Sequence, residues 1–260
     1  MTAVRLHSWR AWRQGWINLS QHPWPLLGFS AVVLALHLLG WALFAAGERS
    51  DSGVLSVCLH LLGLVLYGAS LLWMVEGLGR GGLAIARQKP MSWRALWRWR
   101  GRRSWRLIRS LAAMAAAAAA TALVSFAIWS ALLLALPGLS LAAALLGLVA
   151  TAAVVLSQLF APFLVLDRRM NATACFRTGV MLLEHHWPGL LLLACLLITT
   201  LLTPLLIGFV AEALVQGIGV AATALACVGS LPLVATTVAQ AYLQLLSELP
   251  PTARLKPRAR

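Results

Sequence analysis

The stretch WPLLGFSAVVLALHLLGWALFAA, residues 24–46, runs for 23 positions without a charged side chain. A helix needs about 20 apolar residues to cross the hydrocarbon core of a bilayer, so this stretch predicts a transmembrane helix. It lacks a small-residue cleavage site, so we expect it to remain as a helix. Five further apolar runs lie near residues 54–78, 110–136, 139–166, 188–211 and 216–246. The fold class we expect is all-α: a polytopic membrane helix bundle with about six transmembrane helices.

The composition excludes an ordinary soluble fold, because 61% of the chain is apolar and only 11% is charged. Twenty-one Lys and Arg against seven Asp and Glu give a net charge of +14, which in a soluble protein would indicate nucleic-acid binding. Here the cations lie between apolar runs, where membrane topology explains them. The neighbouring tryptophans would have to leave the bilayer to stack on bases, so we expect no nucleic-acid partner.

The distribution of the cations predicts the orientation. Twenty of the 21 Lys and Arg fall on one side of the six runs, and only Arg49 falls on the other. The positive-inside rule therefore places both the N-terminus and the C-terminus in the cytoplasm. Ten of the twelve tryptophans share this basic side, where an amphipathic indole prefers to lie.

An aromatic-Arg pair recurs along the chain at spacings of 81 and 83 residues, as Trp12-Arg13, Trp93-Arg94 and Phe176-Arg177. Each pair precedes two apolar runs, which predicts a pseudo-threefold repeat of about 82 residues. The expected units of this single transmembrane domain, 1–260, are residues 6–79, 90–166 and 171–248, and residues 249–260 form a basic cytoplasmic tail.

Each unit is expected to contain a cytoplasmic interfacial helix followed by a helix hairpin. The linkers within the hairpins, 47–53, 137–138 and 212–217, are short enough to pair their helices antiparallel. In the first unit one helical face gathers apolar side chains, a pattern typical of a helix lying flat at the headgroups. These residues are Leu6, Trp9, Trp12, Trp16 and Leu19.

Three of the seven acids, Glu76, Asp167 and Glu248, close the second, fourth and sixth runs on the basic side. We expect each carboxylate to pair with an arginine of an interfacial helix and so lock the hairpin to it. The alternative is an acid resting in headgroup water, because exposed ion pairs contribute little.

Five polar residues inside or near the runs are candidates for an intramembrane pathway. His37 and His60 lie at matching depth on either side of the first outer turn, either as a functional pair for protons or a metal or as partners in a neutral interhelical hydrogen bond. Gln158 and Gln240 occupy equivalent places in two units, and could face a polar cavity or hold helices together by amide hydrogen bonds. Glu212 is the fifth candidate.

Asp167, Glu184, His185 and His186 are close together in sequence, which raises the hypothesis of a hydrolase. No nucleophile elbow, H-E-x-x-H motif or P-loop accompanies them. We therefore expect no catalysis, no cofactor and no metal.

The connection from Arg80 to Arg109 carries ten cations, four tryptophans and no acid. A Lys or Arg near an anionic leaflet contributes about 1 kcal/mol to membrane attraction, so contact with anionic lipid is expected. The candidate contact residues are Arg13, Arg94, Arg98, Arg100, Arg102, Arg103, Arg106 and Arg177.

The stretch Phe160-Ala-Pro-Phe-Leu-Val-Leu-Asp167, followed by Ala174-Cys-Phe-Arg-Thr-Gly179, resembles a bacterial group of six-helix membrane domains. Some are attached to glycerophosphodiester phosphodiesterases and others stand alone. The resemblance implies a bacterial inner (plasma) membrane protein, but no phosphodiesterase activity, because no such catalytic domain is present in the sequence.

Two functions follow as hypotheses. The first is a non-enzymatic scaffold or accessory protein that contacts anionic lipid or a membrane-protein partner. The alternative is a small-solute transporter or permease with a polar pathway between the hairpins, formed by the five polar candidates.

Overall fold

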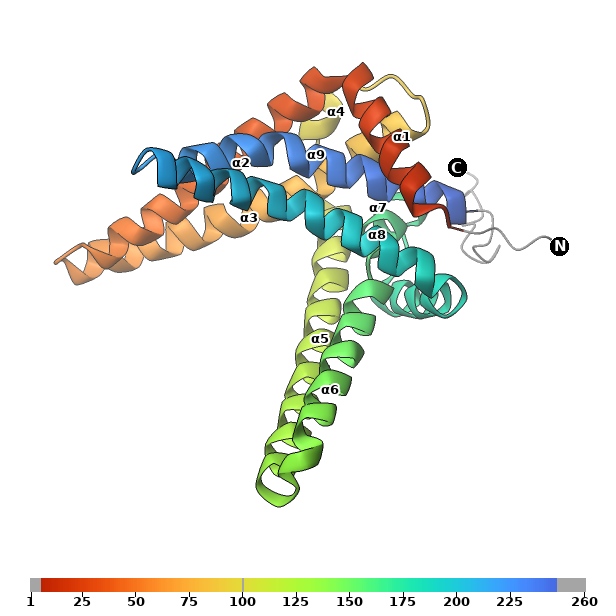
Figure 1. The fold of residues 1–260 in the computed structure, drawn as a ribbon. Coiled ribbons are helices and arrows are strands. Elements are labelled where there is room, and N and C mark those ends of the chain that lie inside the picture. The colour runs from red at the N-terminus through yellow and green to blue at the C-terminus, as the bar shows by residue number, and fades with distance from the viewer. Residues whose placement is uncertain (1–5, 100, 247–260) are drawn as a thin grey trace. The chain divides into compact units, whose positions relative to one another are not determined.

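The computed structural model describes residues 6–99 and 101–246, and within them every regular element is a helix (Figure 1). The all-α prediction is confirmed. The elements are α1 (Ser8–Gln21), α2 (Pro23–Glu48), α3 (Gly53–Ala86), α4 (Trp93–Trp97), α5 (Gly101–Ala135), α6 (Pro137–Ser157), α7 (Ala161–Arg168), α8 (Ala172–Leu214) and α9 (Gly219–Leu245).

Six helical segments in the described part of the chain are long and apolar enough to cross a membrane. They are α2, α3, α5, α6 with α7, α8, and α9, with lengths from 26 to 43 residues. About 20 residues suffice for a bilayer core, so the prediction of a multi-pass membrane protein is confirmed.

The outward faces of these helices are apolar, as lipid requires. Leu134 is 89% exposed and Leu225 is 76% exposed. In α5, no residue of the most apolar segment is buried within the protein. Apolar surface on this scale is unfavourable in water and is stable only against hydrocarbon.

The chain folds as two compact units. Residues 6–8, 101–194 and 244–246 belong to unit 1, and residues 9–99 and 195–243 belong to unit 2. Helices α8 and α9 therefore contribute to both. Division of the chain into three sequence repeats stays a prediction.

Unit 2 contains the hairpin of α2 and α3, which lie side by side in Figure 1. The two helices approach closely at Gly40 and Gly63: a Cβ on Gly40 would lie 2.8 Å from the backbone nitrogen of Tyr67, and a Cβ on Gly63 would lie 2.8 Å from the carbonyl oxygen of Gly40. Small residues let helix backbones approach in a membrane, where dispersion contacts rather than hydrophobic burial hold helices together.

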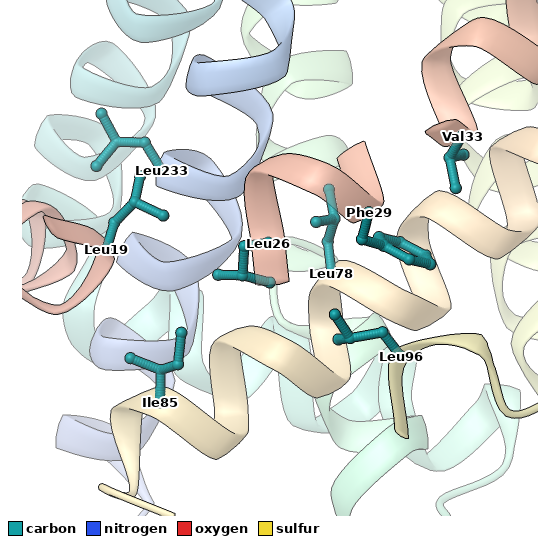
Figure 2. Packing of buried hydrophobic residues seen from close by; sticks show 8 residues of the cluster. All are labelled: Leu19, Leu26, Phe29, Val33, Leu78, Ile85, Leu96 and Leu233. Carbon is teal, nitrogen blue, oxygen red and sulfur yellow. The ribbon is translucent and has the colours of Figure 1, made fainter. Parts of the chain in front are cut away.

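A buried apolar cluster lies at the basic end of this hairpin (Figure 2). It joins side chains from α1, α2, α3, α4 and α9. Its members are Leu19, Leu26, Phe29, Val33, Leu78, Ile85, Leu96 and Leu233.

Helix α1 packs against α9 within unit 2 through small residues. A Cβ on Gly15 would lie 2.6 Å from Oγ1 of Thr237, and the hydroxyl of Thr236 donates a hydrogen bond to the Gly15 carbonyl at 3.2 Å. The face of α1 that meets the protein therefore includes Ala11 and Gly15. Trp9 and Trp16, which the sequence pattern placed on the apolar face, point outward and are more than half exposed.

The predicted interfacial helices differ in length. Helix α1 has 14 residues and lies directly before α2. Helix α4 has only five residues and ends at Trp97, and α5 begins at Gly101. Helices α3 and α5 in turn extend eight and nine residues beyond the predicted spans, to Ala86 and from Gly101. Hydropathy marks where a helix leaves the lipid, whereas the helical hydrogen bonds continue into the interface.

In unit 1, α5 and α6 form the second hairpin, packed where Gly147 meets Ser125. The break between α6 and α7 places Pro162 in the first turn of α7, where its missing N–H costs nothing. Helix α8 bends at His186, whose φ of −129° is not helical. Pro188 lacks the N–H that would bond the Glu184 carbonyl, which explains the bend.

The turn between α8 and α9 lies in unit 2 and is held by Glu212. Its carboxylate oxygens accept hydrogen bonds from the backbone N–H groups of Gly217, at 2.9 Å, and Gly219, at 2.7 Å. The third hairpin thus turns at residues 215–218, close to the predicted linker.

Candidate functional site

Glu76 on α3 is completely buried and forms an ion pair with Arg80 one turn later, with 3.6 Å between Glu76 Oε1 and Arg80 Nη2. The same guanidinium donates to the carbonyl of Glu76 through Nε, at 3.1 Å, and to the carbonyl of Leu96 through Nη2, at 3.2 Å. Nη1 donates to the carbonyl of Arg98. Arg80 therefore satisfies carbonyl groups that α4 leaves open at its C-terminal end, and fastens α4 to α3.

The sequence predicted an ion pair between Glu76 and an arginine of the interfacial helix. In the described residues Glu76 pairs with Arg80, which lies on α3 itself, and Arg80 links α3 to the end of α4 through the Leu96 carbonyl. At the corresponding place in unit 1, Asp167 lies 3.8 Å from its neighbour Arg168, and Arg106 of α5 donates to the Arg169 carbonyl at 3.3 Å. Glu248 lies outside the described residues.

A cluster of aromatic rings packs α4 onto the α2–α3 hairpin. Trp97 lies at its centre, 5.0 Å from Phe29, 4.9 Å from Trp73 and 5.6 Å from Trp93 between ring centroids. Two glycines make room for these rings: Gly77 lies against Phe29 and Gly28 against Trp93.

The predicted lipid-contact arginines are mostly exposed. Arg106 also bonds the end of α7, Arg103 is half-buried, and Arg100 lies outside the described residues. Exposed indoles accompany them, and Arg109 lies 5.2 Å above the ring of Trp105. The exposed members of the predicted set are Arg13, Arg94, Arg98, Arg102, Arg106 and Arg177. We call the members of this set in unit 2, Arg13, Arg94 and Arg98, with the exposed Trp9, Trp16, Trp93 and Trp99 of the same unit, the basic collar.

The structure does not bring His37 and His60 together. His37 bonds the Ser70 hydroxyl at 3.0 Å and packs on Tyr67, whereas His60 bonds the carbonyl of Ser56 at 2.8 Å. At about 1.5 Å per residue, the seven residues from His60 to Tyr67 separate the two levels by about 10 Å. The expectation of equal depth was wrong: His37 lies level with Tyr67 and Ser70, about two helical turns further from the α2–α3 turn than His60.

The remaining polar candidates have local roles. Gln158 is buried in unit 1, where its amide donates to Ser157 at 2.9 Å and to the Phe176 carbonyl at 3.5 Å. Glu212 holds the α8–α9 turn. Gln240 is half-buried in unit 2. Within the described residues, no group of three or more His, Cys, Asp or Glu could hold a metal ion.

A cavity of about 610 Å³ with both polar and apolar lining residues opens at the basic end of unit 2, and the sequence did not predict it. It lies between the end of α1, the start of α2 and the chain that follows α3. Its polar lining residues are Asn18, Gln21, His22, Gln88 and Lys89, with Trp24 beside them. A signal for it exists in the sequence: Gln21-His22-Pro23 and Gln88-Lys89-Pro90 each place a proline after a polar pair, which marks the end of a helix.

Comparison of this chain with protein-family models, curated proteins and solved structures finds no match.

Proposed function

We propose that this chain is a non-enzymatic protein of a bacterial inner membrane, with both termini in the cytoplasm, that binds anionic phospholipid through its basic collar. The observation that carries the proposal is the exposure of the collar's arginines and indoles next to helices built to lie in lipid. Each cation near an anionic leaflet adds about 1 kcal/mol of attraction, and the indoles set the depth of this part of the protein at the level of the headgroups.

The anchoring of α4 supports a lipid-binding surface rather than a loose loop. Arg80 and Trp97 hold the segment that bears Arg94 and Arg98 against the hairpin. A cation on a fixed element loses less conformational entropy on binding than one on a mobile loop.

The permease alternative gains less support from these contacts. Gln158 and Glu212 are engaged in local hydrogen bonds, and His37 and His60 lie at different depths. We therefore take the lipid-binding function forward.

The test is native mass spectrometry of the full chain released from a bilayer of phosphatidylcholine and phosphatidylglycerol. We expect the wild type to retain phosphatidylglycerol in excess over its share of the bilayer, and Arg13→Gln/Arg94→Gln/Arg98→Gln to lose this excess. Arg49→Gln is the matched control, because Arg49 is exposed at the opposite end of the α2–α3 hairpin. Absence of enrichment in the wild type, or an equal loss with Arg49→Gln, would contradict the proposal.

A further inference from the structure

The cavity in unit 2 is lined by a residue of the buried cluster, Ile85, and by one lysine, Lys89. Ile85 therefore makes the floor of the cavity part of the core (Figure 2). Asn18 also lines it and is only 7% exposed. The oxygen of Asn18 accepts a hydrogen bond from Gln14 at 3.0 Å, which leaves its amide N–H groups for a ligand.

Backbone hydrogen bonds place Lys89 at the cavity. The N–H of Gln88 bonds the Ile85 carbonyl at 2.8 Å and the N–H of Lys89 bonds the Ala84 carbonyl at 2.9 Å, closing the end of α3. Gln88 itself adopts a left-handed conformation with φ of 54°. The turn therefore holds the lysine next to the polar lining instead of letting α3 continue.

The lining combines one lysine with the amides of Asn18, Gln21 and Gln88 and the imidazole of His22. Lys89 is the single Lys or Arg among the described residues that line the cavity, and no carboxylate lines it. A lysine ammonium suits a phosphate oxygen, whereas the amides of Asn18, Gln21 and Gln88 both donate to and accept from hydroxyl groups.

We propose that this cavity binds the headgroup of a monoanionic phospholipid, with Lys89 on the phosphodiester and the amides on uncharged hydroxyls of the headgroup. This inference rests on the proposed function and assigns a specific site within it. A headgroup that carries an ammonium would be repelled by Lys89, and no carboxylate among the described residues lines the cavity to balance its charge. A dianionic phosphomonoester would bring two negative charges to one cation.

The position of the cavity identifies the source of the phosphodiester as the bilayer. Trp24, in the first turn of α2, lines the cavity and is 81% exposed. An exposed indole where a span begins lies at headgroup depth, so the cavity opens where lipid phosphates are found. Its volume lies within the range usual for small-ligand sites.

The test titrates dioctanoyl phosphatidylglycerol into the full chain held in phosphatidylcholine nanodiscs, with bound lipid counted by native mass spectrometry. We expect one lipid per chain to bind saturably at the cavity, more tightly than lipid at the collar, and the affinity of this site to fall about tenfold in Lys89→Gln. The matched control is Arg10→Gln, which removes an exposed cation of α1 that neither lines the cavity nor belongs to the basic collar. Dioctanoyl phosphatidylethanolamine and phosphatidic acid should bind more weakly than phosphatidylglycerol.

Each contrary outcome has a distinct meaning. An equal loss in Lys89→Gln and Arg10→Gln would overturn the cavity site but not lipid binding by the collar. Displacement of the lipid by an equal concentration of inorganic phosphate would overturn the assignment to a lipid. If the wild type binds no phosphatidylglycerol at all, the proposed function fails as well.

Discussion

Gln88 and Arg169 hold the left-handed backbone conformation, with φ of 54° and 55°. Gln88 follows the end of α3, and Arg169 follows the end of α7. A capping residue comes shortly after each of them: Ser92 accepts a hydrogen bond from the N–H of Ala95 in α4, and Asn171 accepts one from the N–H of Ala174 in α8. The two left-handed residues are 81 residues apart, close to the 83 residues between the pairs Trp93-Arg94 and Phe176-Arg177 that follow them. At two separate places the chain therefore ends one helix with a left-handed residue and begins the next with a side-chain cap.

The left-handed conformation costs an ordinary L-residue about 1 kcal/mol, and glycine avoids this cost. We therefore expect Arg169→Gly to raise the free energy of unfolding by up to about 1 kcal/mol, and Gln88→Gly to do the same. Unfolding by a denaturing detergent, followed by circular dichroism, measures the change. Arg10→Gly, on an exposed and regular turn of α1, should have the opposite sign. Destabilisation by both substitutions at the left-handed positions would contradict the prediction.

Arg80 makes an ion pair and three backbone hydrogen bonds with one guanidinium. Removing one partner of a buried pair is more costly than the pair is stabilising, because the other charge stays buried. We expect Arg80→Met to lower the free energy of unfolding by about 3 kcal/mol and to expose the segment around α4 to protease. Arg80→Lys should recover little of the lost free energy of unfolding, because a lysine ammonium lacks the planar arrangement of N–H donors of a guanidinium.

The control for Arg80 is Arg94→Met, on α4 itself, where the side chain is exposed. Protease should cut this variant near α4 at the wild-type rate. Adding Glu76→Gln to Arg80→Met should return part of the lost stability, because the buried carboxylate charge is then gone. Equal protease sensitivity in Arg80→Met and Arg94→Met would show that Arg80 does not fasten α4.

At the scale of elements, the α2–α3 hairpin depends on backbone contact at Gly40 and Gly63. A side chain on Gly63 would meet backbone atoms of Gly40 and Phe44, which cannot move without separating the helices. We expect Gly63→Leu to cost about 1–3 kcal/mol, measured as a lower thermal midpoint in mild detergent. Gly68→Leu on the same helix is the matched control, because nothing lies within 4 Å of its Cβ position. Similar midpoints in the two variants would argue against close packing of the hairpin.

The elements themselves could be predicted from sequence to different degrees. Spans such as residues 24–46 and the turns at 47–53 and 137–138 were predicted closely, because lipid forces every backbone group of a span into a helix. The packing face of α1 was not, because Gly15 contributes contact through its backbone and leaves no trace in an apolar pattern.

The candidate site was predicted less well than the spans. Exposed collar arginines follow from charge alone, but the link from Arg80 to the carbonyls of Leu96 and Arg98 depends on where α4 ends. The cavity likewise depends on three chain segments that meet only in the fold, so its residues look like ordinary polar linkers. The relative depths of His37 and His60 depend on how α2 is aligned along α3, and residue counts from the turn do not specify this alignment.

For the whole molecule, the crowding of cations on one side predicts the threading of the chain. A green fluorescent reporter fused after Arg260, which matures in the cytosol but not after export through the general secretory route, should be fluorescent. The matched fusion is alkaline phosphatase at the same residue, which is active only outside the cytosol and should be inactive. An active phosphatase and a dark fluorescent fusion would reverse the orientation.

The division of unit 2 between residues 9–99 and 195–243 has a consequence for biosynthesis. Gly15 and Gly82 pack on Thr237 and Ala235, which the ribosome adds more than 150 residues after Gly82. At about 5–20 residues per second, the first hairpin waits on the order of 10–30 seconds in the bilayer before its partner helix is inserted. During that interval its small-residue surfaces are open to other membrane helices, and a chaperone or insertase that shields them would raise the yield of correctly assembled protein.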